Sequence, residues 1–200
     1  MNTATDTRSR IIAAAKPRFH SRSYANVGIQ EICESAGVQK GSFYHFFPSK
    51  RDLVLAVIDE FADEWANGFV AEAFDPALPP MERIDYLVDA AYFWQRSIKQ
   101  MHGRVLGCIF GNLTLEVSTQ DDILRAKLQA IFSHAKSRFK ETLEQAVAAG
   151  TIAPLDSDLT AEAMLAYHEG VILLAKSQND PELIYRLGPA IKTLRVETGA

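Results

Sequence analysis

Apolar residues recur at spacings of three and four along most of the chain, a period that is typical of amphipathic helices. Two of the clearest stripes run from Val54 to Phe69 and from Leu124 to Leu143. Runs of β-branched residues with strict alternation are missing, and no hairpin turn joins two such runs. The pattern therefore predicts an all-α protein of about nine helices, without internal repeats or low-complexity segments.

Glycine, proline and capping residues divide this pattern into separate helices. A proline inside a helix usually kinks or breaks it, so we expect Pro17 to interrupt a first helix that ends near Ser23 and Tyr24. Gly37 is expected to end the second helix, and Ser49 to cap a long fourth one. Later helices are expected over residues 84–98, 124–143, 158–178 and 181–196.

The second and third predicted helices are separated by a very short turn. Such a turn needs a small residue where the helices touch and a glycine where the backbone takes a left-handed conformation. Cys33 and Gly37 meet these needs, and Phe43 is placed to pack back on the second helix. This spacing predicts a helix-turn-helix, whose second helix usually enters the major groove of DNA.

The exposed side of the third predicted helix carries groups suited to DNA. Glutamine can bond adenine edges, lysine can reach guanine or phosphate, and serine and tyrosine can donate to phosphate. A glycine there lets the backbone approach closely, while Lys50 opposes the dipole of the next helix, which favours a phosphate contact. The predicted DNA-contacting residues are Gln39, Lys40, Gly41, Ser42, Tyr44, His45 and Lys50.

Charge is distributed unevenly along the chain. Residues 1–51 hold eight Lys/Arg against three Asp/Glu, a net charge of +5, whereas the rest carries 13 against 22, a net charge of −9. A basic first quarter on an acidic body indicates that one end meets a polyanion. The alternative is that the uneven charge arises by chance, because a basic patch alone does not establish nucleic-acid binding.

Length and composition exclude several other classes. The chain has 200 residues, 48% of them apolar and 23% charged, which is ordinary for a soluble globular protein. Its longest uncharged apolar stretch, residues 105–115, is too short to span a bilayer, and its polar N-terminus predicts no export. Two cysteines make no disulfide framework, and the histidines lack metal-ligand spacing. We expect a cytoplasmic protein that binds no membrane, metal or cofactor.

The stretch GVQKGSFYHFFPSKRDLVLAVI resembles the signature of the TetR family of one-component transcriptional regulators, roughly G-V-S-K-G-T-L-Y-H-H-F-P-S-K-E-x-L. Residues 8–58 follow the family pattern in register. The resemblance implies a helix-turn-helix DNA-binding domain over residues 1–47 and a ligand-binding and dimerisation domain over residues 48–200. It also implies that Phe43 and Phe47 occupy core positions and that six of the residues named above occupy DNA-contacting positions: Gln39, Lys40, Ser42, Tyr44, His45 and Lys50.

The chain departs from the family pattern in two places. Residues 17–19 read Pro-Arg-Phe where the family usually has Glu-Leu-Phe. Val27 and Gly28 replace residues that usually include hydroxyl side chains near the start of the second helix. A hydroxyl cap and one phosphate contact are therefore missing, and Asn26 is a candidate substitute cap.

The resemblance implies how the larger domain acts. Family members pair through their last two helices, here 158–178 and 181–196, and a homodimer reads two half-sites of double-stranded operator DNA. The alternative is that these apolar faces close only their own core. The middle helices would enclose a small-molecule effector, although pocket and core residues look alike in sequence. The candidate lining residues are Trp65, Phe69, Trp94, Cys108, Phe110, Asn112, Tyr167 and His168.

One cysteine is a candidate sensor. The segment LGCIFGNL is similar to a Gly-Cys-x-x-Gly-Asn-Leu stretch of one TetR subgroup, some of whose members respond to reactive electrophiles, quinones or small unsaturated acids. Arg104 and His102 would favour the thiolate of Cys108. An inert buried cysteine is the alternative.

Two other functions fit only parts of the sequence. An enzyme could pair Cys108 with a histidine, but no surrounding motif supports this. A scaffold whose helix-turn-helix contacts proteins would leave the charge asymmetry unexplained. The interpretation that covers all features is a dimeric transcriptional regulator, a repressor released from a palindromic operator by a small molecule.

Overall fold

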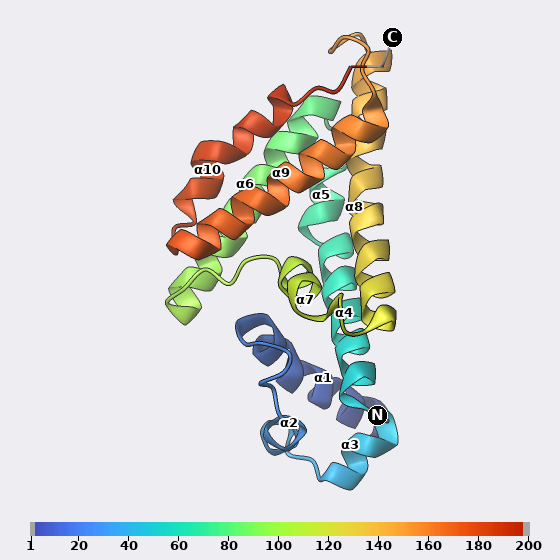
Figure 1. Ribbon diagram of the computed structural model, residues 1–200, viewed down its shortest axis with the longest axis vertical. Coiled ribbons are helices and arrows are strands. Elements are labelled where there is room, and N and C mark those ends of the chain that lie inside the picture. The colour runs from blue at the N-terminus through green and yellow to red at the C-terminus, as the bar shows by residue number, and fades with distance from the viewer. Residues whose placement is uncertain (1–2, 198–200) are drawn as a thin grey trace. The chain divides into compact units, whose positions relative to one another are not determined.

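The computed structural model describes the backbone of residues 3–197, which is helical and contains no strand over this range (Figure 1). The predicted all-α fold of about nine helices is confirmed. The count within the described range is slightly higher because the non-helical backbone of Gly68 separates a five-residue helix from the end of α4. The elements are α1 (Thr3–Ser21), α2 (Ile29–Ala36), α3 (Lys40–Phe46), α4 (Lys50–Asn67), α5 (Phe69–Ala73), α6 (Pro80–His102), α7 (Ile109–Val117), α8 (Asp122–Ala148), α9 (Ser157–Gln178), α10 (Glu182–Leu187) and the 3₁₀ helix η1 (Gly188–Thr193).

The chain forms two compact units. The first unit contains the residues up to Glu64 together with Ile109–Leu128, and the second unit contains Trp65–Cys108 and the residues from Gln129 onward. The boundaries fall inside α4 and α8, so these long helices contribute to both units. The functional division between residues 47 and 48 was drawn from the motif, and it stays a prediction.

The first helix is continuous through its proline. Pro17 lies inside α1, so the expected interruption at this residue is wrong, and the helix ends at Ser21. Side chains bond carbonyl groups nearby: Arg18 donates to the Ala14 oxygen at 2.6 Å, and Ser21 donates to the Pro17 oxygen at 2.6 Å. Both are local bonds to carbonyls one turn earlier in α1, and the helix continues through the proline although Pro17 has no amide donor. Ile11 and Phe19 bury the inner face of α1.

The predicted cap of the fourth helix is confirmed. The Asp52 amide donates to the Ser49 hydroxyl at 3.2 Å, and that hydroxyl donates to the Asp52 carboxylate at 2.6 Å. The cap satisfies an amide that has no partner within the helix. Leu53, Val57 and Ile58 of α4 are then fully buried in the first unit.

A buried arginine organises the second unit. Arg83 of α6 donates to the carbonyl oxygens of Leu78 and Pro76 at 3.0 and 3.2 Å, and to the Gln145 side chain of α8 at 2.7 Å. A guanidinium group can make these bonds together because it presents several donors in one plane. Arg83 therefore ties the turn before α6 to α8.

The last predicted helix is only partly correct. A helix was expected over residues 181–196, but α10 ends at Leu187 and the chain tightens into η1. Pro189 lacks an amide hydrogen and so cannot continue the α-helical bonding. Gly188 packs closely on α6, where an added Cβ atom would overlap the Val88 side chain. The change of helix type therefore lets this segment approach α6.

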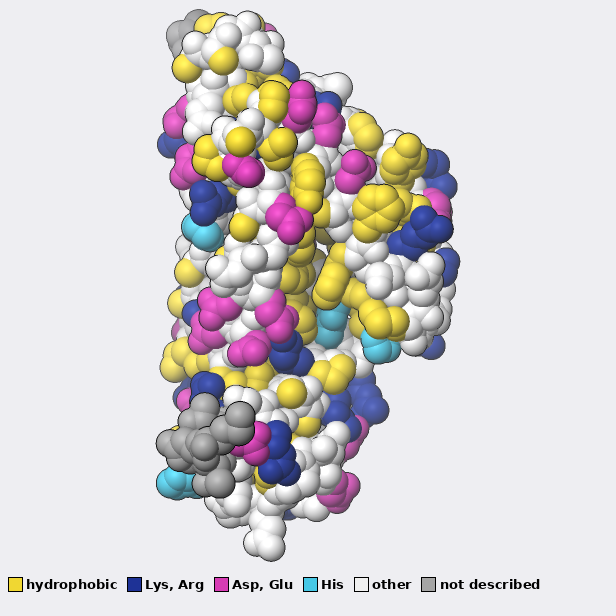
Figure 2. Space-filling view, turned by 180° about the vertical axis from the view of Figure 1, so that it is seen from behind, with side chains coloured by type: hydrophobic (Ala, Val, Ile, Leu, Met, Phe, Trp, Pro, Cys, Tyr) yellow, Lys and Arg dark blue, Asp and Glu magenta, His cyan; other side chains and the backbone are white. Residues whose placement is uncertain are grey.

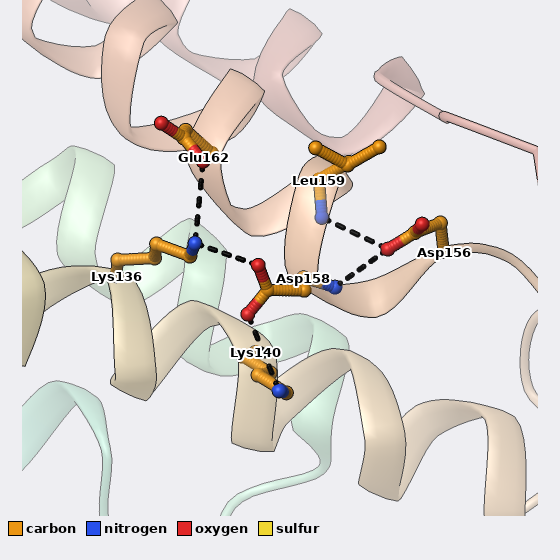
Figure 3. A network of polar contacts seen from close by, with 6 residues as sticks. All are labelled: Lys136, Lys140, Asp156, Asp158, Leu159 and Glu162. Atoms are coloured by element: carbon orange, nitrogen blue, oxygen red, sulfur yellow. Dashed lines mark hydrogen bonds and ion pairs between the residues drawn. The ribbon is translucent and has the colours of Figure 1, made fainter.

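Helices α8 and α9 are joined by charged side chains at the start of α9 (Figure 3). The Asp156 carboxylate accepts hydrogen bonds from the amides of Asp158 and Leu159 at 3.1 and 3.0 Å and caps the helix. Lys136 and Lys140 of α8 reach the Asp158 carboxylate at 2.7 and 3.2 Å. The pairs are partly exposed, so they fix local geometry more than they add stability.

The segment before α7 is held by a buried amide side chain. Gln95 of α6 donates to the Gly107 oxygen at 3.0 Å and accepts from the Gly107 amide at 3.1 Å. Gly107 has φ 76°, a left-handed conformation that favours glycine. The Val105 amide donates to the Asn179 side chain at 2.8 Å. These bonds fix the backbone that leads to Cys108.

Within the described range, none of the helices combines the length and the apolar character that crossing a bilayer demands.

Candidate functional site

The turn between α2 and α3 has the predicted glycine geometry. Gly37 has φ 64°, and its amide donates to the Glu34 oxygen at 3.2 Å while the Val38 amide donates to the Cys33 oxygen at 2.9 Å. This is the bonding of a Schellman turn, which closes a helix and redirects the chain. Arg10 of α1 donates to the Gly37 oxygen at 3.0 Å and also reaches the Ala36 oxygen. The corner of the helix-turn-helix is therefore fixed by the backbone and by α1.

Helix α3 separates buried aromatic rings from exposed polar groups. Phe43 is fully buried, and Phe47 directly after α3 is also buried, as predicted. The ring of Phe43 lies 5.2 Å from that of Tyr44 and 5.9 Å from that of Phe47. Six of the seven predicted DNA-contacting residues are exposed on or beside this helix: Gln39, Lys40, Gly41, Ser42, Tyr44 and His45. They form one polar surface over a rigid aromatic support.

The seventh predicted residue, Lys50, has partners within the first unit. Its ammonium donates to the carbonyl oxygens of Tyr24 and Ala25, the second at 3.3 Å, and lies 4.5 Å from the centre of the Tyr24 ring. Desolvation lowers the pKa of Lys50, and the charge of Glu116 acts in the opposite direction. An ammonium group has three donor hydrogens, so two bonds to carbonyls leave one for a phosphate.

The start of α2 is uncapped by any side chain. The helix begins at Ile29 after Gly28, so the expectation that Asn26 caps it is wrong. Glu31 in the first turn of α2 instead accepts from Arg18 at 3.1 Å and from Arg22 at 2.9 Å. These bonds attach the first turn of α2 to the end of α1.

Sequence reasoning missed Glu116 of α7, which accepts hydrogen bonds from the turn between α1 and α2. The Tyr24 and Ala25 amides donate to its carboxylate at 2.7 and 2.9 Å, and the Ser23 hydroxyl donates as well. The only signal in the sequence is that Glu116 is the sole charged residue of the segment IFGNLTLEV. Nothing in the sequence indicated which backbone amides it would bind.

The structure divides the eight candidate effector residues between the units. Phe110 and Asn112 belong to α7 of the first unit, and the second unit contains Trp65, Phe69, Trp94, Cys108, Tyr167 and His168. Within the second unit, the rings of Trp65 and Phe69 lie 5.5 Å apart. The Tyr167 hydroxyl donates to the Leu187 oxygen at 2.9 Å, which directs it toward α10.

Two adjacent titratable residues of α9 are desolvated, and one of them contacts a candidate effector residue. Cys108 is buried and hydrogen-bonds the Glu169 carboxyl. Burial raises the pKa of Glu169 to about 7, and the bond to Cys108 opposes this rise. Burial lowers the pKa of His168 to about 4. Both α9 side chains nevertheless keep some solvent exposure, so they are desolvated by surrounding protein but still reachable.

Glu169 was another residue that sequence reasoning did not identify. A His-Glu pair inside the apolar stretch between Met164 and Ala175 was the available signal, because polar residues inside a buried helix need partners. Among the residues that the structure describes, no group of three or more His, Cys, Asp or Glu side chains is arranged to hold a metal ion.

Helices α9 and α10 also expose large apolar side chains. Leu173 and Leu174 are 51% and 46% exposed, and Tyr185 is 60% exposed. Figure 2 shows hydrophobic side chains gathered at the surface of the part of the second unit that contains α10. Exposed apolar side chains that cluster in this way are typical of surfaces that bind other proteins.

Together these features define a class of protein. A short helix with an exposed polar face, reached through a glycine turn and joined to a separate helical body, is the architecture of a helix-turn-helix transcription regulator. Residues 11–57 match the family described as bacterial regulatory proteins, tetR family, and residues 80–191 match the tetracyclin repressor-like C-terminal domain. The chain belongs to the TetR family, as the sequence signature predicted.

Relatives of known name support this membership. The chain is similar to the transcriptional regulator AcuR of Cereibacter sphaeroides, with 32% identity over 88% of this chain and 78% of the relative. It is 28% identical to the transcriptional repressor DhaR of Mycobacterium sp. strain GP1, over 89% of this chain and 86% of the relative. The crystal structure of a regulatory protein TetR from Rhodobacter sphaeroides superposes with a TM-score of 0.81 at 31% identity, covering 94% of this chain and 98% of that one.

The homologues and the fold are those of transcription regulators and not of enzymes. Regulators of this family bind operator DNA and small-molecule effectors, and they dimerise.

Proposed function

We propose that this regulator is a repressor that reads a palindromic operator through α3. The observation that carries the proposal is the exposure of six predicted DNA-contacting residues beside the fully buried Phe43. Gln39 and Lys40 at the start of α3 are the candidates for base contacts, and Ser42, Tyr44 and His45 are candidates for phosphate contacts. Lys50 would use its remaining donor on a phosphate. DNA of the host lies in the cytoplasm, where we expect the protein to act.

We propose that α9 and α10 form the homodimer contact. Their exposed leucine and tyrosine side chains would be buried between two copies, and a two-fold dimer would present two α3 helices to successive half-sites.

The proposed effector site lies in the second unit at Cys108 and Glu169, with Trp65, Phe69, Trp94, Tyr167 and His168 as further candidates. Phe110 and Asn112 belong to the first unit, and their part in effector binding stays a prediction. An effector would displace the operator by favouring a state in which the two α3 helices no longer fit successive grooves. A preference of about 3 kcal/mol for that state lowers operator affinity about a hundredfold.

Operator binding through α3 can be tested with Tyr44→Ala. The protein is titrated against DNA from upstream of its own gene at several salt concentrations, and fluorescence anisotropy reports the Kd. We expect at least a tenfold weaker operator affinity in the variant, with the dimer intact, and a steep salt dependence in the unaltered protein. Tyr86→Ala, which removes an exposed tyrosine of the second unit, is the matched control. Full operator affinity in Tyr44→Ala would exclude the proposed docking of α3.

Covalent sensing by Cys108 is a separate hypothesis, motivated by its hydrogen bond to Glu169 and by the subgroup resemblance. The test adds a quinone to the operator complex of the unaltered protein and of Cys108→Ser, with Cys33→Ser as the control for the second buried thiol. We expect the quinone to release the operator from the unaltered protein and from Cys33→Ser. It should no longer release the operator from Cys108→Ser. Equal release from all three proteins would rule out a covalent role for Cys108.

A further inference from the structure

The turn between α1 and α2 is held by a carboxylate from one helix and by an ammonium group from another. Glu116 of α7 binds the backbone amides of Tyr24 and Ala25 at 2.7 and 2.9 Å. Lys50 of α4 binds the carbonyl oxygens of the same two residues. Tyr24 and Ala25 therefore each donate their amide to an anion and offer their carbonyl to a cation. We call residues 23–25 with Glu116 and Lys50 the turn clamp.

Apart from this clamp, the backbone groups of the turn make few hydrogen bonds, although the Tyr24 ring stacks on that of Phe19. Its internal bonds run from the Asn26 amide to the Ser23 oxygen at 3.0 Å and from the Val27 amide to the Tyr24 oxygen at 3.4 Å, the second of which is long. The first turn of α2 follows Gly28, which supplies no side-chain cap. The polar groups of residues 23–25 therefore rely on partners from α7 and α4, beside the stacking of the Tyr24 ring on Phe19 of α1.

This turn leads into α2, so it contributes together with α1 to the placement of α3. The chain leaves the turn into the eight-residue α2, and the Schellman turn at Gly37 joins α2 to α3 with fixed geometry. Arg10 and Arg18 attach α2 to α1, whereas Glu116 attaches the preceding turn to α7. The chain enters the first unit at Ile109, the first residue of α7, directly after Cys108 of the second unit.

Long-range electrostatics alone would disfavour an acidic residue in a unit that binds a polyanion. Glu116 is partly buried, which by itself would raise the pKa of its carboxyl, but the hydrogen bonds from Ser23, Ala25 and Tyr24 and the charge of Lys50 outweigh burial and lower the pKa overall. The carboxylate is therefore ionised at neutral pH. Its negative charge repels DNA, so its value to the protein must come from the bonds that it accepts.

We propose that Glu116 is a positioning residue for operator binding, which holds residues 23–25 so that α2 and α3 are correctly placed for the major groove. The inference rests on the proposed function of α3 in DNA recognition. It assigns Glu116 no contact with DNA. It also assigns Lys50 a second task, because the same side chain completes the turn clamp from α4.

The charge of Glu116 allows a sharp test, because a positioning role and a purely electrostatic role predict opposite changes in operator affinity when that charge is removed. Glu116→Gln keeps the size of the side chain but replaces one acceptor oxygen with an NH₂ group that opposes a backbone amide. If only long-range charge mattered, removal of a negative charge would strengthen DNA binding. We expect instead that operator affinity falls about tenfold or more, the size of effect that follows when hydrogen bonds to a charged group are lost.

Asp122→Asn is the matched control. Asp122 lies in the same unit, carries the same charge, and pairs at the surface with Arg125. We expect this variant to bind the operator as tightly as the unaltered protein or slightly more tightly. Affinity for unrelated DNA should change little in Glu116→Gln, because positioning of α3 matters for specific contacts more than for general attraction to phosphate.

Amide hydrogen exchange provides a readout that needs no DNA. In Glu116→Gln the Tyr24 and Ala25 amides should exchange at least about tenfold faster, since they lose an ionised acceptor, while amides inside α1 keep their protection. Ser23→Ala removes one of the three bonds to the carboxylate and should show a smaller change of the same kind. This milder variant carries the test if Glu116→Gln does not fold.

The outcomes separate this inference from the proposed function. If the unaltered protein does not bind DNA from upstream of its own gene, the proposed function fails. Hydrogen exchange alone then decides whether the turn clamp exists. If the unaltered protein binds but Glu116→Gln binds equally well or more tightly, as Asp122→Asn does, the positioning role of Glu116 is overturned. Unchanged exchange at Tyr24 and Ala25 in both Glu116→Gln and Ser23→Ala would overturn the turn clamp itself.

Discussion

Helix α3 of the first unit and helix α9 of the second unit place their polar residues in opposite ways. On α3, Tyr44 and the polar residues around it face solvent, and Phe43 fills the interior. On α9, His168 and Glu169 are desolvated by the surrounding protein, whereas Leu173 and Leu174 face outward. One helix is arranged to present charge and hydrogen bonds to a large polar partner. The other buries polar side chains and exposes apolar ones, the pattern on which the proposed effector site and the proposed dimer contact rest.

The difference explains why one site was easier to recognise than the other. Six of the seven residues predicted to contact DNA lie within residues 39–45, and the buried Phe43 shows which side of α3 faces inward, so local spacing was enough to predict this set. The residues around Cys108 come from segments more than 50 positions apart, and Glu169 meets Cys108 only through the packing of α9. Long-range packing of this kind leaves no fixed spacing in the sequence.

The largest effect that tests this comparison is expected from Phe43→Ala. The change removes a fully buried ring from the interior of the first unit, so the free energy of unfolding should fall by about 3–5 kcal/mol. Tyr44→Ala, one residue away on the exposed face, should change it by only about 0.5 kcal/mol. Urea unfolding followed by circular dichroism measures both values. Similar losses in the two variants would show that α3 does not separate support from recognition in the way the structure indicates.

The sequence predicted the fold well where a signal was local. Gly37 ended α2 in the expected conformation, Ser49 capped α4, and Phe43 and Phe47 were buried. Each of these depends on neighbours within a few positions. The helix-turn-helix and its family therefore followed from the residues themselves.

Predictions failed or were missing where distant groups decide the outcome. Pro17 is different, because α1 continues through it and the side-chain bonds beside it, from Arg18 and Ser21, are local. The last helix changed type where Gly188 packs on Val88 of α6. Glu116 binds a turn more than 90 residues earlier in the chain, so no spacing rule could pair them. In the last two cases a contact between remote segments overrides or supplements the local pattern.

The second unit can be tested through the opposite pKa shifts of two adjacent residues. Burial raises the pKa of Glu169 from 4.5 to about 7. Between these pH values the folded protein keeps a proton on this carboxyl and the unfolded chain does not. The free energy of unfolding therefore falls as pH rises from about 4.5 to 7. Burial lowers the pKa of His168 from 6.5 to about 4. Between these pH values the unfolded chain binds a proton at this residue and the folded protein does not. The free energy of unfolding therefore falls as pH decreases from about 6.5 to 4. Each shift corresponds to at most about 3 kcal/mol.

Because the two effects have opposite signs, they should largely cancel in the unaltered protein between pH 4.5 and 6.5. Glu169→Gln leaves only the histidine, so its free energy of unfolding should increase with pH across this window. His168→Asn leaves only the carboxyl, so its free energy of unfolding should decrease with pH across the same window and up to about 7. Urea midpoints measured at half-unit pH steps would show the two slopes. Parallel profiles for both variants would mean that α9 does not bury these side chains, and the contrast between α3 and α9 would then be lost.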